Sequence, residues 1–397
     1  MLPILFLGLG LLAGLTQTEA DAEVAKVLPE LTQIRGFAFR SRVPVTVIDD
    51  AKARAYALAR FRRMMPESKI EADELAFRLL GLVPKDTDVL KTLLDVLEEQ
   101  AGGFYDPGTK SFYLLDDMPK DMTPLLTAHE MTHALEDQRY GLDGRIEKII
   151  DDDDASFALS SLIEGSATLA AAAYVTSGIN AGTLDPARIA AVSEAVPTER
   201  LNAMPEALRR QLLGPYVLGM TFLTRGRPAA GPFPKADVDA AWSRPPRSSE
   251  QILHPEKYWD KAQHDDPKRV LFASPSKALG EGWKRAGYGI LGELTLGSLV
   301  GAKTPGGADL AASGFSWTNA AASGWGGDRF EVWTHGDQAL CLLATVWDSA
   351  KDAAEFEAAL PAGRPGLAVK RAGDRVAIVA GAAGERRDGL LALLAAP

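Results

Sequence analysis

The sequence predicts an α+β protein, with a mainly helical larger part that contains a short β-hairpin and a smaller α+β unit at the carboxy-terminal end. Between residues 51 and 100, apolar residues recur three and four positions apart, as Leu90, Leu93, Leu94 and Leu97 do, which is the period of a helix with one buried face. Two aromatic-rich segments flank a DPG turn near residue 107. In the last hundred residues, β-branched runs alternate with one helical run. At 397 residues the chain is too long for one average domain.

Each element follows from its local pattern. A short strand at 43–49 precedes helices at 51–65, 69–80 and 86–100, the last of them capped by Asp86 or Thr87. The hairpin strands lie at 103–105 and 111–115, and a helix of about four turns begins after Pro124. Another helix, apolar enough to be buried, starts near Asp154. The carboxy-terminal unit comprises strands RFEVWTH, ALCLLATVW, GLAVKRA and RVAIVAG and the helix DAAEFEAAL.

The amino terminus predicts export. Fifteen apolar residues are followed by a polar stretch with small residues at Ala20 and Ala22, as in a signal peptide; an uncleaved membrane anchor is the alternative. We assign 1–20 to a signal peptide, 21–100 to a helical region leading into the central domain, 101–270 to that central domain and 271–397 to the carboxy-terminal α+β domain. The protein would be periplasmic or secreted, with membrane contact only through an uncleaved leader.

Charge and cysteine content exclude other classes. The formal net charge is −10 and the sequence has no Lys/Arg-rich block, so nucleic acid is not the expected partner. Cys341 is the only cysteine, so no intramolecular disulfide forms and no cysteine near residue 20 can carry a lipid.

The segment TAHEMTHALEDQ holds two of the five histidines, His129 and His133. Residues four apart on a helix lie one above the other, so both imidazoles can reach one ion at the ~2.0–2.1 Å of a Zn–N bond. Glu130 lies one step round the helix, where its carboxylate could take a proton from an attacking water. The alternative is two hydrogen-bonded core histidines. We expect a metal site with Glu130 as its base.

A catalytic zinc site needs a third protein ligand. A third histidine six residues after His133 is excluded, since Arg139 stands there. Asp185 lies in a predicted loop, and the aspartates at 151–154 fit helix capping better than cation binding. Glu164 lies in the apolar helical context SLIEGSAT, where a lone carboxylate is costly unless bound. Gly165 beside it would let this helix and the histidine helix approach closely.

These residues resemble a known family. HExxH followed by a helical Glu in an EGxA context is similar to the gluzincin zinc metallopeptidases. The phrases AHEMTHALEDQRYGL, GGFYDPGTKSFYL, SSEQILHPEKY and GWGGDRFEVW resemble a little-characterised bacterial and archaeal family of HEXXH metallopeptidases, in patches from about residue 43 to 356. The resemblance implies a zincin-like catalytic domain that binds one Zn²⁺ per chain through His129, His133 and Glu164, with Glu130 as the catalytic base. The sequence departs from the family's phrases at Glu136, where Gln is common, and at Ser166, where an acidic residue is common.

Several other residues are candidates for supporting roles. His254, Tyr258 and Tyr216 could share the charge of the oxyanion with zinc, and His254 ranks first because histidine is scarce. Asp137, four residues beyond His133, either orients a ligand or is an exposed helical carboxylate. Strand 111–115 could be the edge that pairs with an extended peptide. Trp325 and Arg329 would hold the carboxy-terminal unit together or dock it.

The leading functional hypothesis is an exported zinc metallopeptidase that acts on a peptide or protein substrate. The alternatives are a non-peptidase zinc hydrolase and an envelope binding or interaction protein that a metal stabilises. A pure binding site has no need of Glu130, and structural zinc usually takes four protein ligands.

Overall fold

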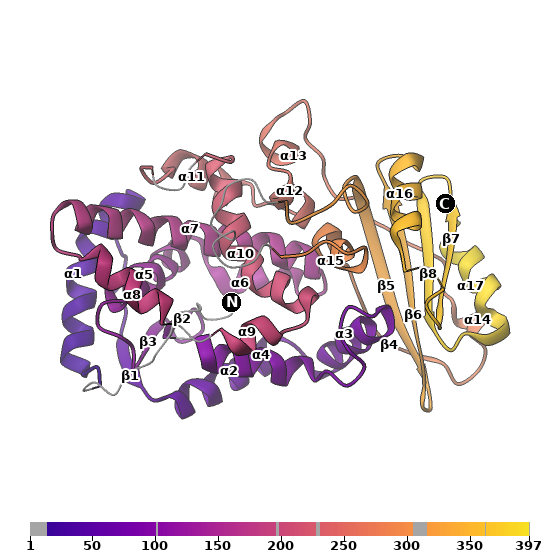
Figure 1. The fold of residues 1–397 in the computed structure, drawn as a ribbon, viewed down its shortest axis with the longest axis horizontal. Helices are drawn as coiled ribbons and strands as arrows, with labels where there is room; N and C mark the ends of the chain where they lie inside the picture. Colours follow the sequence, from indigo (N-terminus) through magenta and orange to yellow (C-terminus); the bar gives the residue numbers. More distant parts are fainter. Residues whose placement is uncertain are drawn as a thin grey trace.

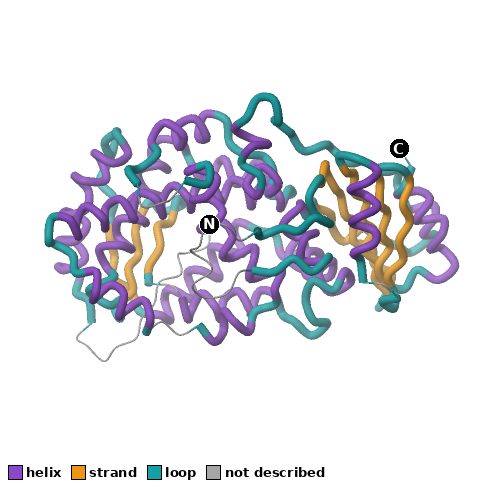
Figure 2. Tube along the Cα trace, turned by 45° about the horizontal axis from the view of Figure 1, so that its top comes forward, coloured by secondary structure: helices purple, strands orange, loops and turns teal. Residues whose placement is uncertain are grey.

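The computed structural model describes residues 14–100, 102–195, 198–227, 231–304, 316–361 and 363–396. It confirms the predicted α+β class. Helices and a three-stranded sheet form one end of the molecule, and a five-stranded sheet lies at the other end (Figures 1 and 2).

Helix α1 (Gln17–Arg35) contains both residues at which we expected signal-peptide cleavage, Ala20 and Ala22. Ala20 is fully buried, and the Thr16 side chain caps the helix by accepting a hydrogen bond from the Glu19 backbone. Cleavage at either site would remove this cap and the first turn of the helix. Residues 1–13 of the predicted leader lie outside the described residues.

The small sheet corrects one prediction. Strands β2 (Gly103–Asp106) and β3 (Ser111–Leu115) form the predicted hairpin, but β1 (Val45–Ile48) pairs with β3 in parallel. The strand order is therefore β1-β3-β2, and 111–115 is the central strand, unavailable to a peptide. Periodicity identified all three strands but does not reveal which strands pair. The edge strand next to the histidine helix is β2.

The central helices are long and tightly packed. Helix α5 (Thr123–Tyr140) carries the two motif histidines, α7 (Asp153–Asn180) carries Glu164, and α10 (Glu206–Thr224) packs along α7. A Cβ on Gly165 would lie 2.3 Å from the backbone carbon of Gly219. The close approach expected at Gly165 is therefore real, but it brings α7 against α10 and not against α5.

Helix α7 is also long and apolar enough to cross a membrane, yet 72% of its most apolar window is buried inside the protein. This burial is what a core helix shows. Its start is capped by Asp152, which accepts a hydrogen bond from the Ala155 backbone, as expected for part of the aspartate run.

The remaining helices surround this core. The predicted helices at 51–65, 69–80 and 86–100 appear as α2 (Asp50–Met64), α3 (Glu67–Leu80) and α4 (Val89–Gln100). Asp88, and not Asp86 or Thr87, accepts the hydrogen bond from the Lys91 backbone at the start of α4. The other helices on this side are α6 (Leu142–Ile146), α8 (Pro186–Glu194), α9 (Glu199–Ala203), α11 (Lys235–Ser243), α12 (Ser249–Leu253) and α13 (Glu256–Trp259).

The larger sheet has the strand order β4-β5-β6-β8-β7 with every pair antiparallel. Its strands are β4 (Lys284–Gly289), β5 (Trp325–His335), β6 (Gln338–Trp347), β7 (Leu367–Ala372) and β8 (Arg375–Gly381), and the helices near it are α14 (Ser276–Leu279), α15 (Gly292–Leu299), α16 (Ala350–Ala359) and α17 (Arg387–Leu394). Sequence analysis found four of the strands and missed β4, whose KRAGYG lacks alternating apolar residues.

Residues distant in sequence complete the sheet's core. Ala76 and Leu80 of α3 pack with Phe330 and Leu343 in one apolar cluster, and α3 lies beside β4 in Figure 1. The unit that begins near residue 271 therefore shares its core with the amino-terminal helical region. Within this unit, Trp325 is fully buried in the same apolar cluster and Arg329 of β5 lies over the ring of Tyr288 of β4, so both residues hold the unit together.

Candidate metal centre

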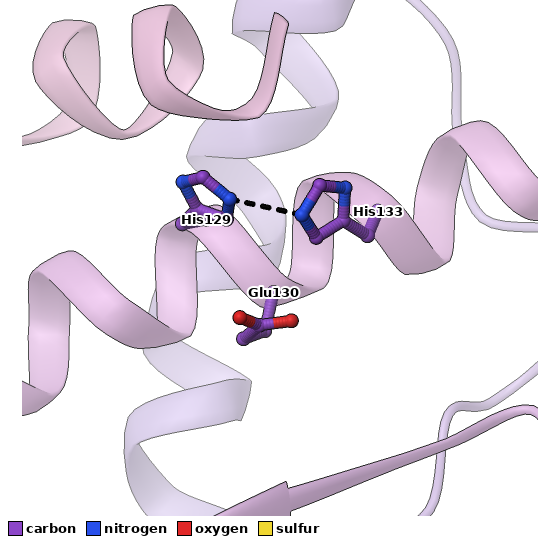
Figure 3. Close-up of side chains that lie close together, drawn as sticks. All are labelled: His129, Glu130 and His133. Carbon is purple, nitrogen blue, oxygen red and sulfur yellow. Dashed lines mark hydrogen bonds between the residues drawn. The ribbon is translucent and has the colours of Figure 1, made fainter. Parts of the chain in front are cut away.

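The two motif histidines converge on one point. Their Nε2 atoms are 2.9 Å apart, and Figure 3 shows the imidazole rings side by side along α5 with the Glu130 carboxylate on an adjacent side of the helix. His129 is 2% exposed and His133 1%. A buried histidine pair in contact through its metal-binding nitrogens needs a shared proton or a shared ion between the rings.

Glu164 completes a triangle of donor atoms. Its Oε2 lies 3.2 Å from Nε2 of His129 and 3.3 Å from Nε2 of His133. In a tetrahedral site with bonds of about 2.0–2.1 Å, ligand atoms lie roughly 3.3 Å apart, which follows from the tetrahedral angle. The three observed separations of 2.9, 3.2 and 3.3 Å match that geometry closely enough for one small cation with two nitrogen ligands and one oxygen ligand. The described residues therefore fit a zinc site with its fourth position open.

Glu130 is close to this triangle but has a different partner. Its carboxylate lies within 4.8 Å of the ligand nitrogens of both histidines. Oε2 accepts a hydrogen bond of 2.7 Å from the backbone N–H of Tyr105 on β2. Since Leu115 of β3 donates to the Gly102 carbonyl, alternation along the strand turns the amide of Tyr105 to the free edge. The base therefore lies directly against the edge of the sheet.

Burial and mutual pairing set the ionisation of this group. Burial lowers the pKa of His129 to about 4 and raises the pKa of Glu130 to about 8. Burial also opposes charge on Glu164, but the His133 charge and hydrogen bonds from both imidazoles lower its pKa to about 2. Burial alone would lower the pKa of His133, but the neighbouring Glu164 carboxylate outweighs this effect and the pKa is raised. Two imidazoles in contact cannot both be charged, so one proton resides on His133, and a dication in the triangle would replace it.

A buried network ties the two ligand helices together. Ser166 of α7 donates a 2.6 Å hydrogen bond to Glu136 of α5, and Arg35 of α1 lies 2.9 Å from the same carboxylate. The Arg35 guanidinium is stacked near the rings of Phe37 and Phe233. The two positions that depart from the resembled family are thus bonded to each other. This network fixes α5 relative to α7, and with them the three ligands.

Asp137 matches neither of its predicted roles. It is buried, and it accepts hydrogen bonds from the Tyr105 hydroxyl at 2.8 Å and from Lys110 at 2.7 Å. The other ring nitrogen of His133, Nδ1, has no hydrogen-bond partner among the described residues, so Asp137 does not orient that ligand. Tyr105 therefore contacts α5 twice, through its backbone to Glu130 and through its hydroxyl to Asp137.

The structure brings one of the three oxyanion candidates to the site. The ring centroid of Tyr216 on α10 lies 6.2 Å from that of His129, and burial raises the pKa of its hydroxyl well above the usual value. His254, ranked first from the sequence, instead lies 3.0 Å from Glu293 of α15, and Tyr258 donates to the Arg244 carbonyl. Scarcity of histidine was a poor guide, because His254 serves the packing of α15.

The alternative oxygen ligands lie elsewhere. Asp185 caps α8, while Asp153 pairs with Lys69 at 3.0 Å and Asp154 accepts a hydrogen bond from the Ser249 backbone. A separate cluster of Glu250, Asp265 and Asp348 surrounds the Lys257 ammonium, and Asp348 also pairs with Lys268. Capping and ion pairing thus engage each of these carboxylates, although Oε2 of Glu250 has no hydrogen-bond partner among the described residues.

Sequence reasoning missed Tyr105 and Arg35. Nothing in GGFYDPG marks Tyr105 as a contact of Glu130, since that contact uses a backbone amide. An available signal was its position immediately before the DPG turn, in a hairpin directly before the histidine helix. Arg35 gave a weaker signal, as an arginine at a helix end preceding the Gly36 cap.

Comparisons with known proteins are sparse. A family model described as "Domain of unknown function (DUF8575)" matches residues 281–364, which span β4 to the segment after α16. Neither the curated proteins nor the solved structures gave a match. The family match lies in the carboxy-terminal unit, outside the helices that carry the histidines and Glu164.

Proposed function

We propose that this protein is an exported, zinc-dependent metallopeptidase with one metal ion per chain. The observation that carries the proposal is the triangle of His129, His133 and Glu164 donor atoms at tetrahedral spacing, with Glu130 beside it. Three protein ligands and an open fourth position are typical of catalytic zinc, whereas structural zinc is usually closed by four.

Zinc in this triangle would supply a Lewis acid for the scissile carbonyl and lower the pKa of the attacking water. Glu130 takes the proton of that water and passes it to the leaving amine. The Tyr105 amide donates to Glu130, which favours the ionised form of this carboxylate and fixes its orientation. Of the three candidates, Tyr216 is the one whose ring lies near His129, so its hydroxyl would be the donor to the oxyanion.

The substrate would be a peptide or protein that lies along β2. The Tyr105 amide on this side of the strand is already bonded to Glu130, so a peptide beside β2 would pass its backbone by the base without pairing to that amide. This replaces the 111–115 strand of the sequence prediction. Export rests on the apolar amino-terminal run alone.

The test is the metal content and peptidase activity of the full chain and its variants. We expect about one zinc per chain, lost in His129→Ala and Glu164→Ala and kept in Glu130→Gln, which loses turnover. Asp185→Ala, an exposed helix cap, is the control and should change neither quantity. Equal turnover in Glu130→Gln removes this residue from its role. Zinc without cleavage of any peptide would favour a non-peptidase hydrolase or a metal-stabilised binding protein.

A further inference from the structure

Two adjoining cavities flank the metal centre. One, of about 240 Å³, reaches Glu130 and Tyr105, and the other, of about 290 Å³, reaches Glu164 and Tyr216. They share six lining residues, which are Phe61, Met65, Leu93, Asp153, Ser156 and Ser160. Because these residues belong to both cavities, the two form one groove that opens beside the base and beside the carboxylate ligand.

Helix α7 provides the polar wall of the groove. Asp153, Ser156, Ser160 and Glu164 follow one another at spacings of three and four residues, so they share one face of the helix. At 1.5 Å per residue, the distance from Glu164 to Asp153 is roughly 16 Å, the length of about five residues of extended chain. The Ser160 hydroxyl forms no hydrogen bond within the described part of the chain. It is available to a bound group one helical turn from the metal ligand.

The opposite wall is apolar. Phe61 and Met65, in and just after α2, and Leu93 of α4 line both cavities and are only half-buried. Helices α2 and α4 lie next to each other (Figure 1), and Ala53 is the only buried residue of α2. Half-buried apolar side chains of this kind gain free energy when a ligand covers their exposed parts.

The far end of the groove carries negative charge. Asp73 and Asp153 share the Lys69 ammonium at 2.7 and 3.0 Å, which leaves one net negative charge when both carboxylates are ionised, while Glu74, which also lines this end, is paired with Arg78. An anionic ligand is therefore disfavoured. An acyl chain would leave the polar wall of α7 unsatisfied, whereas an extended peptide presents polar backbone to one wall and side chains to the other.

We propose that this groove binds an extended peptide segment whose bulky apolar side chains pack against α2 and α4 while its backbone faces the serines of α7. Apolar peptides are then the preferred substrate class. The inference rests on the proposed peptidase function for its chemistry, but binding in the groove can be measured separately from turnover.

The experiment measures peptide binding by calorimetry in the zinc-loaded Glu130→Gln protein. The probes are an eight-residue peptide with Leu and Phe at its central positions and the same peptide with Ser and Asn there. Leu93→Asp changes the apolar wall, and Ser160→Phe adds bulk from the polar wall. Leu271→Asp is the matched control, because Leu271 is 54% exposed and lines neither cavity. Zinc content and the urea midpoint verify that each variant is folded.

We expect the apolar peptide to bind roughly tenfold or more tightly than the polar one, since burial of one large apolar side chain accounts for a factor of that size. Leu93→Asp and Ser160→Phe should abolish this difference, and Leu271→Asp should keep it. Equal binding of the two peptides overturns the inference. If the unmodified enzyme cleaves both peptides equally well, the groove inference fails and the peptidase function stands. Tight apolar binding without cleavage supports the groove and refutes the proposed function.

Discussion

Replacing Gly165 by alanine would push apart the two helices that hold Glu164 in place. The new Cβ would lie 2.3 Å from the backbone carbon, 2.6 Å from the oxygen and 2.7 Å from the Cα of Gly219. Unstrained carbon atoms lie about 3.5 Å apart, so α7 and α10 must separate by roughly 1 Å. Overpacking of this kind costs about 3 kcal/mol when backbone must move, and alanine recovers about 1 kcal/mol of helix propensity. The net loss of stability is about 2 kcal/mol.

Glu164 precedes this contact in the chain, so the same shift moves a ligand by more than the ~0.2 Å that metal geometry tolerates. We expect zinc affinity, measured by chelator competition, to fall about tenfold or more. Urea unfolding of the metal-free protein measures the stability change. Gly389→Ala is the control, because a Cβ at Gly389 in α17 meets nothing within 4 Å and should stabilise by about 1 kcal/mol. Unchanged stability and zinc affinity in Gly165→Ala would refute the close packing described here.

Two further predictions concern the edge strand and the carboxylates. Tyr105→Phe removes the 2.8 Å hydrogen bond to Asp137 and should cost about 1 kcal/mol of stability. The zinc content should stay at the wild-type value while kcat falls. An unchanged kcat would show that the contact between Tyr105 and Asp137 does not position Glu130. Burial raises the pKa of Asp328 to about 7, so its folded form binds a proton that the unfolded chain releases above pH 4. Stability of the metal-free protein should therefore decline as the pH rises from about 4 to 7, and urea titrations at pH 5 and 8 should show a smaller decline in Asp328→Asn.

Local sequence patterns predicted seven of the eight strands in the described residues and selected the three side chains whose donor atoms lie together in the candidate metal centre. The spacing of His129 and His133 on a helix and the apolar surroundings of Glu164 are properties of short segments, and the structure brings their donor atoms within 3.3 Å of one another. The hairpin before them was recognisable from its DPG turn. Periodicity reports which residues are buried, and a buried histidine pair with a carboxylate already restricts the chemistry.

Tertiary structure decided which neighbours these elements meet. Pairing of β1 with β3 left β2 as the free edge, and the contact between its Tyr105 amide and Glu130 has no sequence signature because every non-proline residue carries that amide. Gly165 was expected to bring its helix close to the histidine helix, but its close contact is with α10. His254 was ranked by the scarcity of histidine and Asp137 was chosen by its helical spacing from His133, but packing places them against Glu293 and Tyr105. The residue type determines which hydrogen bonds and charges a side chain can offer. Long-range packing determines which groups come within hydrogen-bonding distance of it.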